Sequence, residues 1–303
     1  MGRRFAFFLA WLFTIGVTGA GASPSFPVTV KDASGTTVTL TAPPQAIVSL
    51  TLPTDELLLE LVDPSRLKAI EVFAIDPGIS NVVDEARKIP RRVKADLEQI
   101  VGLKPDLVIV AEWKDKAFVQ SLRDAGVKVF VFRSPTDFSE LTTAIDQLAT
   151  LVGEPARGRA LEARIDQRLA AVSAKVRLTD PAPTVLMYSF DGSTYGRGTS
   201  FDALVSRAGL VNAAAQAGLS GWPKLSKEQV VALDPDFIIL PSWSFDGRDS
   251  PQKFLESFRS DPAFSGLTAV KTGRVVILPD RHLQATSQFM VDGVEDLVRA
   301  AWR

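Results

Sequence analysis

One pattern of polar and apolar positions occurs twice in the chain. Residues 96–110 read DLEQIVGLKPDLVIV and residues 226–240 read SKEQVVALDPDFIIL, so Glu-Gln, Leu, Pro-Asp and the final apolar run keep the same register. Each copy predicts a short helix that begins at a polar cap, Asp96 or Ser226, followed by a Pro-Asp turn and an all-apolar strand. A strand without polar alternation is buried on both faces, as in a parallel α/β sheet. The chain is therefore expected to consist of two similar halves.

Further elements of the first half follow from shorter patterns. Alternation on either side of the turn at 32–35 predicts a hairpin of residues 28–30 and 38–40. An apolar strand over 47–50 leads into a helix that carries residues 57–62, for which Thr54 or Asp55 is the expected cap. The remaining strands are expected at 107–110 and 127–132, and the remaining helices at 116–125 and 137–152.

A long amphipathic helix is predicted between the two copies of the repeat. Over 156–176, apolar residues recur at helical spacing, namely Leu161, Ile165, Leu169, Val172 and Val176. The second half is expected to place strands at 184–188, 237–240 and 275–278 and a closing helix at 291–302. The fold class is thus α/β, with two similar lobes, each with a central, mostly parallel sheet flanked by helices, joined by one long rigid helix.

The first 22 residues have the pattern of a secretory leader. Arg3 and Arg4 precede an almost uninterrupted apolar run, residues 5–17, and the small residues Ala20-Gly21-Ala22 follow. We expect cleavage after Ala22 and a mature chain free in the periplasm, with an uncleaved membrane anchor as the alternative. The chain has no cysteine to carry a lipid, so a lipoprotein is not expected. The predicted organisation is a signal peptide at 1–22, an N-terminal lobe at 23–153, a connecting helix at 154–178 and a C-terminal lobe at 179–303.

Composition narrows the classes of partner. The chain has 34 basic and 35 acidic residues, so no overall field favours nucleic acid or anionic lipid. A single histidine and no cysteine argue against a site for a bare transition metal, because such sites draw mainly on imidazole and thiolate. A site built from oxygen ligands alone stays open.

Several phrases together resemble the periplasmic substrate-binding proteins of iron-siderophore, haem and cobalamin ABC importers. They are SLTLPTDELLLEL at 49–61, the two copies of the repeat, and TYGRGTSFDALVSRAGLVN at 194–212. The resemblance covers nearly the whole mature chain. It implies two α/β lobes that hold a ligand between them with only a small hinge motion, in a receptor that we expect to be a monomer.

The resemblance also gives the repeat a role. In known members, one surface glutamate on each lobe pairs with arginines of the two membrane permease subunits, which are driven by ATPase subunits. These glutamates correspond to Glu98 and Glu228. A carboxylate near a helix start is favoured by the helix dipole, and two related lobes can present charges to a two-fold partner. The alternative is that both residues only stabilise their helices.

The ligand is expected at loops that lie at strand ends, including the segments before each repeat, and that face the space between the lobes. The candidate residues are Arg92, Trp113, Tyr195, Arg197, Trp222, Trp243, Arg281 and His282. This mixture of aromatic and basic residues suits a large anionic chelate with flat apolar faces. Other roles stay open: Arg92 in a solvated basic face, the aromatic residues in the core, and His282 as a polar loop residue rather than an iron ligand.

An iron-siderophore is therefore the first expectation for the ligand, and cobalamin is the alternative. Trp222-Pro223 resembles the phrase in which a cobalamin-binding member contacts its ligand with tryptophan. Haem is less favoured, because haem-binding members usually place a tyrosine just before the first docking glutamate, where this chain has Arg91 and Arg92.

Catalysis is not expected, and no catalytic residue or resident cofactor is predicted. The chain has no nucleophile elbow, GxxxxGK[ST] loop or HExxH motif, although acidic residues such as Asp76 and Glu112 could be paired. A periplasmic sensor on the same fold is the remaining alternative.

Overall fold

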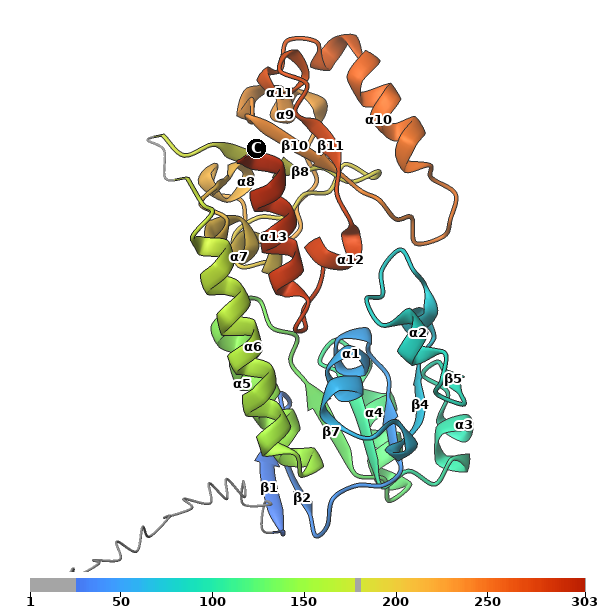
Figure 1. Cartoon of the computed structure of the whole chain (residues 1–303). Helices are drawn as coiled ribbons and strands as arrows, with labels where there is room; N and C mark the ends of the chain where they lie inside the picture. The colour runs from blue at the N-terminus through green and yellow to red at the C-terminus, as the bar shows by residue number, and fades with distance from the viewer. Residues whose placement is uncertain (1–25, 178–180, 303) are drawn as a thin grey trace, which may run out of the picture.

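Two parallel sheets form the centres of two lobes in the computed structural model, which describes residues 26–177 and 181–302 (Figure 1). The first sheet has the order β5-β4-β3-β6-β7 and the second has the order β11-β10-β8-β9. Their central strands are buried along their whole length, as the apolar runs predicted. The α/β class and the two-lobed arrangement are confirmed. The predicted leader at 1–22 lies outside the described residues.

The first lobe begins with an antiparallel hairpin and continues with the five-stranded sheet and its helices. Its strands are β1 (Val28–Lys31), β2 (Thr37–Leu40), β3 (Ile47–Ser49), β4 (Leu67–Glu71), β5 (Arg92–Val93), β6 (Leu107–Ala111) and β7 (Val129–Phe132). Its helices are α1 (Leu52–Leu61), α2 (Val83–Ala86), α3 (Leu97–Gly102), α4 (Lys116–Asp124) and α5 (Phe138–Val152), with single 3₁₀ turns at Pro64–Arg66 and Val72–Ile75.

The second lobe repeats the alternation of parallel strands and helices on a smaller sheet. Its strands are β8 (Thr184–Met187), β9 (Val211–Asn212), β10 (Phe237–Leu240) and β11 (Val275–Ile277). Its helices are α7 (Ser200–Arg207), α8 (Ala213–Gln216), α9 (Lys227–Leu233), α10 (Pro251–Ser260), α11 (Thr268–Lys271), α12 (Asp280–Leu283) and α13 (Met290–Ala301), with a 3₁₀ turn at Pro262–Phe264.

The repeated segment forms the same unit in both lobes, α3 followed by β6 and α9 followed by β10. Asp96 and Ser226 cap the two helices, as predicted, by accepting the backbone N–H three residues later. The aspartate of each Pro-Asp pair fixes the neighbouring strand. Asp106 accepts the Ala46 N–H at 2.9 Å before β3, and Asp236 accepts the Thr184 N–H at 2.8 Å at the start of β8. This shared role accounts for the conservation of the aspartate between the two copies.

The long connector is α6 (Pro155–Ser173), which runs beside both lobes (Figure 1). Its predicted apolar face, including Leu161, Ile165 and Leu169, is buried. The helix ends at Ser173, before the expected end at residue 176. Val176 therefore lies beyond the helix and packs against the core as a partly buried side chain.

The predicted cap of α1 is wrong. The helix begins at Leu52 after Thr51, and neither Thr54 nor Asp55 is the N-cap. Pro53 sits in the first turn, where its fixed φ and missing N–H suit a helix start, so the helix begins earlier than expected. Thr54 and Asp55 are instead buried inside the helix. No helix within the described residues combines the length and apolar character needed to cross a bilayer.

Candidate ligand-binding site

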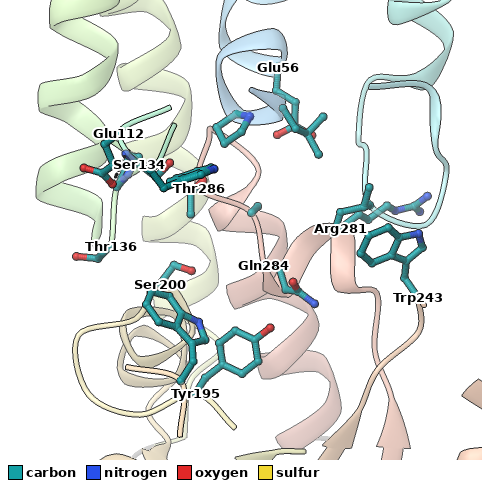
Figure 2. A pocket seen from close by; sticks show the side chains of 17 residues that line it. Glu56, Glu112, Ser134, Thr136, Tyr195, Ser200, Trp243, Arg281, Gln284 and Thr286 are labelled. Atoms are coloured by element: carbon teal, nitrogen blue, oxygen red, sulfur yellow. Dashed lines mark hydrogen bonds between the residues drawn. The ribbon is translucent and has the colours of Figure 1, made fainter. Parts of the chain in front are cut away.

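A pocket of about 380 Å³ lies between the two lobes (Figure 2). The first lobe lines it with residues from α1 and from the loops after β6 and β7, and the second lobe with residues from the loops after β8, β10 and β11. Loops after parallel strands meet at one edge of a sheet, so each lobe turns that edge to the other. The polar and aromatic lining residues are Glu56, Glu112, Trp113, Ser134, Thr136, Tyr195, Ser200, Trp222, Trp243, Arg281, Gln284 and Thr286.

All four predicted aromatic candidates line this pocket. Trp113, after β6, is 64% exposed, and Trp222 is 67% exposed, so both indoles stand outside the apolar cores. Tyr195 is more enclosed, because it packs against Phe201 with ring centroids 5.8 Å apart. Burial raises the pKa of the Tyr195 hydroxyl, which is neutral at physiological pH. The pocket therefore offers flat apolar surface from both lobes.

The charged groups that line the pocket are two carboxylates and one guanidinium, among the described residues. Glu112 and Arg281 lie on opposite sides of the space in Figure 2. Glu112 accepts the Ser134 N–H at 3.3 Å, and Arg281 donates to the Pro77 carbonyl at 3.3 Å across the lobes. The third group is Glu56, on α1.

Glu56 is a buried carboxylate that joins the two lobes. It accepts a hydrogen bond from the Ser287 hydroxyl and two from Asn81, through its backbone N–H and its side-chain amide, each at 3.0 Å. Gln288 donates to the Glu56 backbone carbonyl at 2.8 Å. Burial raises the pKa of Glu56 to about 7, although the hydrogen bonds from Ser287 and Asn81 oppose the shift.

A second buried carboxylate, Asp280, positions lining residues of the second lobe. It accepts the Trp243 N–H at 2.8 Å and the Gln284 side-chain amide at 2.6 Å. Burial raises the pKa of Asp280, against the opposing effect of these hydrogen bonds.

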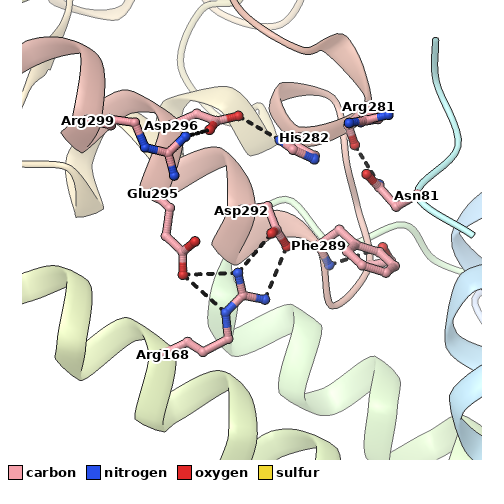
Figure 3. Close-up of polar contacts among 10 residues, drawn as sticks. Asn81, Arg168, Arg281, His282, Phe289, Asp292, Glu295, Asp296 and Arg299 are labelled. Atoms are coloured by element: carbon pink, nitrogen blue, oxygen red, sulfur yellow. Dashed lines mark hydrogen bonds and ion pairs between the residues drawn. The ribbon is translucent and has the colours of Figure 1, made fainter. Parts of the chain in front are cut away.

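Three predicted site residues do not line the pocket. Arg92 lies in the edge strand β5 and donates to the Ala86 carbonyl at 2.9 Å. Arg197 is exposed and donates to the Ala215 carbonyl at 3.1 Å. His282 turns toward α13, where its Nδ1 lies 2.6 Å from Asp296 (Figure 3).

The sequence did not single out several polar lining residues. Glu56 belongs to the phrase at 49–61, and its position amid leucines was the available signal. Gln284 lies three residues after Arg281, so the loop was identified but this side chain was not. Ser134, Thr136 and Ser200 had no distinguishing pattern. Within residues 26–177 and 181–302, no group of three or more His, Cys, Asp and Glu side chains could hold a metal ion.

Comparison with known sequences gives a family and named relatives. The periplasmic binding protein family matches residues 47–282. A cobalamin-binding protein of Halobacterium salinarum is 31% identical over 279 residues, which cover 91% of this chain and 74% of that protein. The ferric dicitrate-binding periplasmic protein FecB of Escherichia coli is 26% identical over 275 residues, covering 84% of this chain and 82% of that protein.

Solved structures with the same architecture include one from Staphylococcus epidermidis, described as a possible iron-binding periplasmic solute-binding protein. It superposes with a TM-score of 0.74 at 19% identity and covers 86% of this chain and 100% of its own. The periplasmic haem-binding protein RhuT of Roseiflexus, in apo form, has a TM-score of 0.72 at 25% identity, over 85% of this chain and 98% of its own.

Proposed function

This chain belongs to the periplasmic binding protein family, the substrate-binding proteins of iron-siderophore, haem and cobalamin ABC importers, and on that premise we propose that its ligand is a corrinoid of the cobalamin type. It is a binding protein rather than an enzyme, it acts outside the cytoplasm, and it serves a membrane permease. The proposed step is capture of the corrinoid between the lobes and its delivery to that permease.

The charge of the pocket is the observation that carries this choice. The preference for an anionic iron-siderophore assumed several basic residues in the cleft, but Arg281 is the only one among the described lining residues. Its guanidinium is also engaged with the Pro77 carbonyl, and Glu112 adds an opposing charge. Anionic chelates are usually bound by arginines that face their oxygens. A corrinoid has a flat ring edged with neutral amides, so its ring does not need arginines in the pocket.

The chemistry of the lining also suits a corrinoid. The exposed indoles of Trp113 and Trp222 offer apolar contact from opposite lobes. Ser134, Thr136, Ser200 and Gln284 offer hydroxyl and amide groups to peripheral amides. The relative from Halobacterium salinarum, named a cobalamin-binding protein, supports the same ligand class.

A ferric chelate is the second candidate. The Escherichia coli relative is named for ferric dicitrate, and Arg281 could face one of its carboxylates. The two candidates differ in charge, so they differ in how binding should respond to salt and to loss of Arg281.

Isothermal titration calorimetry on the protein tests the proposal. We expect one-to-one binding of cyanocobalamin and no saturable binding of ferric citrate, a ferric hydroxamate or haem. Replacing both Trp113 and Trp222 by alanine should weaken cyanocobalamin at least about tenfold, which is about 1.4 kcal/mol. Val231→Ala, an exposed residue outside the pocket lining, is the matched control. Tight binding of a ferric chelate alone would reject the corrinoid.

The remaining features of the importer are part of the same proposal. We propose that the leader at 1–22 is cleaved after Ala22 and that Glu98 and Glu228 dock onto the permease. Both glutamates are exposed in the first turns of α3 and α9, one on each lobe (Figure 1). Lobe boundaries at residues 153 and 179, on either side of α6, complete the proposed organisation.

A further inference from the structure

A second pocket, of about 250 Å³, adjoins the main one. The two share part of their lining, including Leu52, Ile79, Trp113 and Trp243. Thr51, Glu71 and Lys114 line only the second pocket. The hydroxyl oxygen of Thr51 is buried and has no hydrogen-bond partner among the described residues. The second pocket therefore borders the main one through a shared wall and adds polar groups that the main pocket lacks.

The indole ring of Trp243 lies between the two pockets, where contacts with residues of the first lobe fix its position. Its indole N–H donates to Asp76 at 3.0 Å, and the other Asp76 oxygen accepts the Gly78 N–H at 2.8 Å. Phe73 and Phe245 contact the ring edge to face, with centroid distances of 6.1 Å and 5.9 Å. Trp243 and Phe245 come from the second lobe, whereas the other three residues come from the first.

The absence of a side chain at Gly78 leaves room for the indole ring of Trp243. A Cβ atom at residue 78 would lie 2.2 Å from Cδ1 of Trp243, which is far inside van der Waals contact. Gly78 does not adopt a positive φ, so alanine would be compatible with its backbone. Glycine is needed there for the close approach of the indole and not for the turn.

We propose that Trp243 is a specificity-determining gate between the two pockets and that the second pocket receives the nucleotide arm of a complete corrinoid. This inference rests on the proposed function. With the gate in the described position, the main pocket accepts a compact ligand, and a ligand with an arm binds only when the indole moves away from Gly78.

The chemistry of the second pocket matches such an arm. The nucleotide arm carries a phosphodiester and a ribose. Lys114 supplies a cation for the phosphate, and Thr51 supplies an unpaired hydroxyl for a sugar oxygen. Glu71 also lines this pocket and accepts the Phe73 N–H at 2.7 Å. Burial raises the pKa of Glu71 and so favours the neutral acid, against the opposing effects of this hydrogen bond and of the Lys114 charge. The main pocket among the described residues has no comparable phosphate partner apart from Arg281.

The gate can move without disturbing a core. The loop that carries it is open to solvent, and Phe245 is 74% exposed. The Trp243 backbone is fixed by Asp280, so a rotation of the side chain is sufficient. A ligand that must wait for this rotation associates more slowly than one that need not.

Two pairs of variants test the gate. Gly78→Ala displaces the indole sterically, and Gly266→Ala, with nothing near its Cβ, is its control. Asp76→Ala removes the acceptor of the indole N–H, whereas Asp76→Asn keeps one. Stopped-flow association of cyanocobalamin is compared with that of dicyanocobinamide, which has the same ring but no nucleotide arm. We expect cyanocobalamin to associate about tenfold faster with Gly78→Ala and Asp76→Ala, and dicyanocobinamide to change by less than about twofold.

The outcomes separate the gate from the proposed function. Equal changes for both ligands, or no change for either, would overturn the gate while corrinoid binding stands. If the unaltered protein binds neither ligand, the proposed function fails, and fluorine NMR of fluorotryptophan-labelled protein still tests the gate. The Trp243 resonance, assigned with Trp243→Phe, should shift in Gly78→Ala and not in Gly266→Ala. An unshifted resonance would reject a ring held against Gly78.

Discussion

The Glu56 side chain, which lies where the two lobes meet, makes the stability of the protein depend on pH. Its carboxylate is buried between Asn81 of the first lobe and Ser287 of the second, and burial raises its pKa to about 7 from an ordinary value of 4.5. Between these two values the folded protein holds a proton that the unfolded chain releases. Stability is therefore greatest at the acidic end of this window and falls as the pH rises through it.

Replacement of Glu56 by glutamine should reduce this pH dependence. Because glutamine cannot ionise, the variant should gain up to about 3 kcal/mol at about pH 8 relative to the unaltered protein, and much less at about pH 5. Some dependence should remain, since burial also raises the pKa of Asp55 on the same helix. Urea unfolding at the two pH values measures the difference. Glu256→Gln, on exposed α10, is the control, and an unaltered slope in Glu56→Gln would refute a role for the Glu56 carboxyl.

For individual residues, the sequence could predict which loops lie near the pocket but not the direction in which each side chain points. Trp113 and Arg281 follow strands, and their side chains line the pocket. Arg92, in the basic stretch before the first repeat, and His282, after a strand, were also expected to face the cleft, yet an edge strand and a helix face direct them to Ala86 and Asp296. Side-chain direction depends on neighbouring elements, which are absent from a single sequence.

Among the elements, the fully apolar strands and the longest helices were predicted well, whereas β4, α7, α10 and the shortest elements were not predicted. Strands β6 and β10 and helices α5 and α6 occur close to their expected positions. Strands β5 and β9 have two residues each, too few to show a period of two. Helix α1 was placed too late because Thr54 and Asp55 resemble caps, whereas the fold buries both. A polar residue that the tertiary structure buries cannot be recognised by local preference.

The paired elements α3 and α9 give a prediction about transport. Charge reversal at both positions, Glu98→Lys with Glu228→Lys, should lower uptake at least about tenfold because both contacts with permease cations become repulsive. Each single variant should show a smaller loss. Uptake of labelled cyanocobalamin by cells that carry the cognate permease measures this effect, and calorimetry checks that ligand affinity is unchanged.

The matched control reverses two other exposed glutamates, one on each lobe, Glu85 and Glu256. Loss of uptake in both double variants would indicate a general effect of charge. Normal uptake in Glu98→Lys with Glu228→Lys would remove the docking hypothesis and favour a sensor that does not engage a permease.

In the whole molecule, α13 and the segment before it form one of the contacts between the lobes and the connecting helix. The segment before it meets α1, where Ser287 and Gln288 contact Glu56. One turn further, Arg168 of α6 donates to both oxygens of Asp292, at 2.8 Å and 3.2 Å, and to Glu295 at 3.1 Å (Figure 3). A bidentate guanidinium with a second carboxylate is geometrically restrictive. The connector, α13 and the segment that contacts Glu56 are thus joined in sequence, and we expect this to limit the hinge to small motions.

This arrangement predicts that Arg168 contributes more than an ordinary surface arginine. Arg168→Met keeps the apolar stem and should lower the free energy of unfolding by about 1 kcal/mol, because Asp292 and Glu295 are left without their cation. Arg164→Met is the control on the same helix. Among the described residues, Arg164 makes a single ion pair, with Glu60, and this pair is more exposed to solvent, so the substitution should lower the free energy of unfolding by less than about 0.5 kcal/mol. Urea unfolding compares the two variants. Small-angle scattering of ligand-free protein should then show a broader spread of lobe separations for Arg168→Met only, because the contact that fixes α13 against α6 is the one removed. Identical stability and scattering for the two variants would mean that apolar packing along α6 alone sets the angle between the lobes.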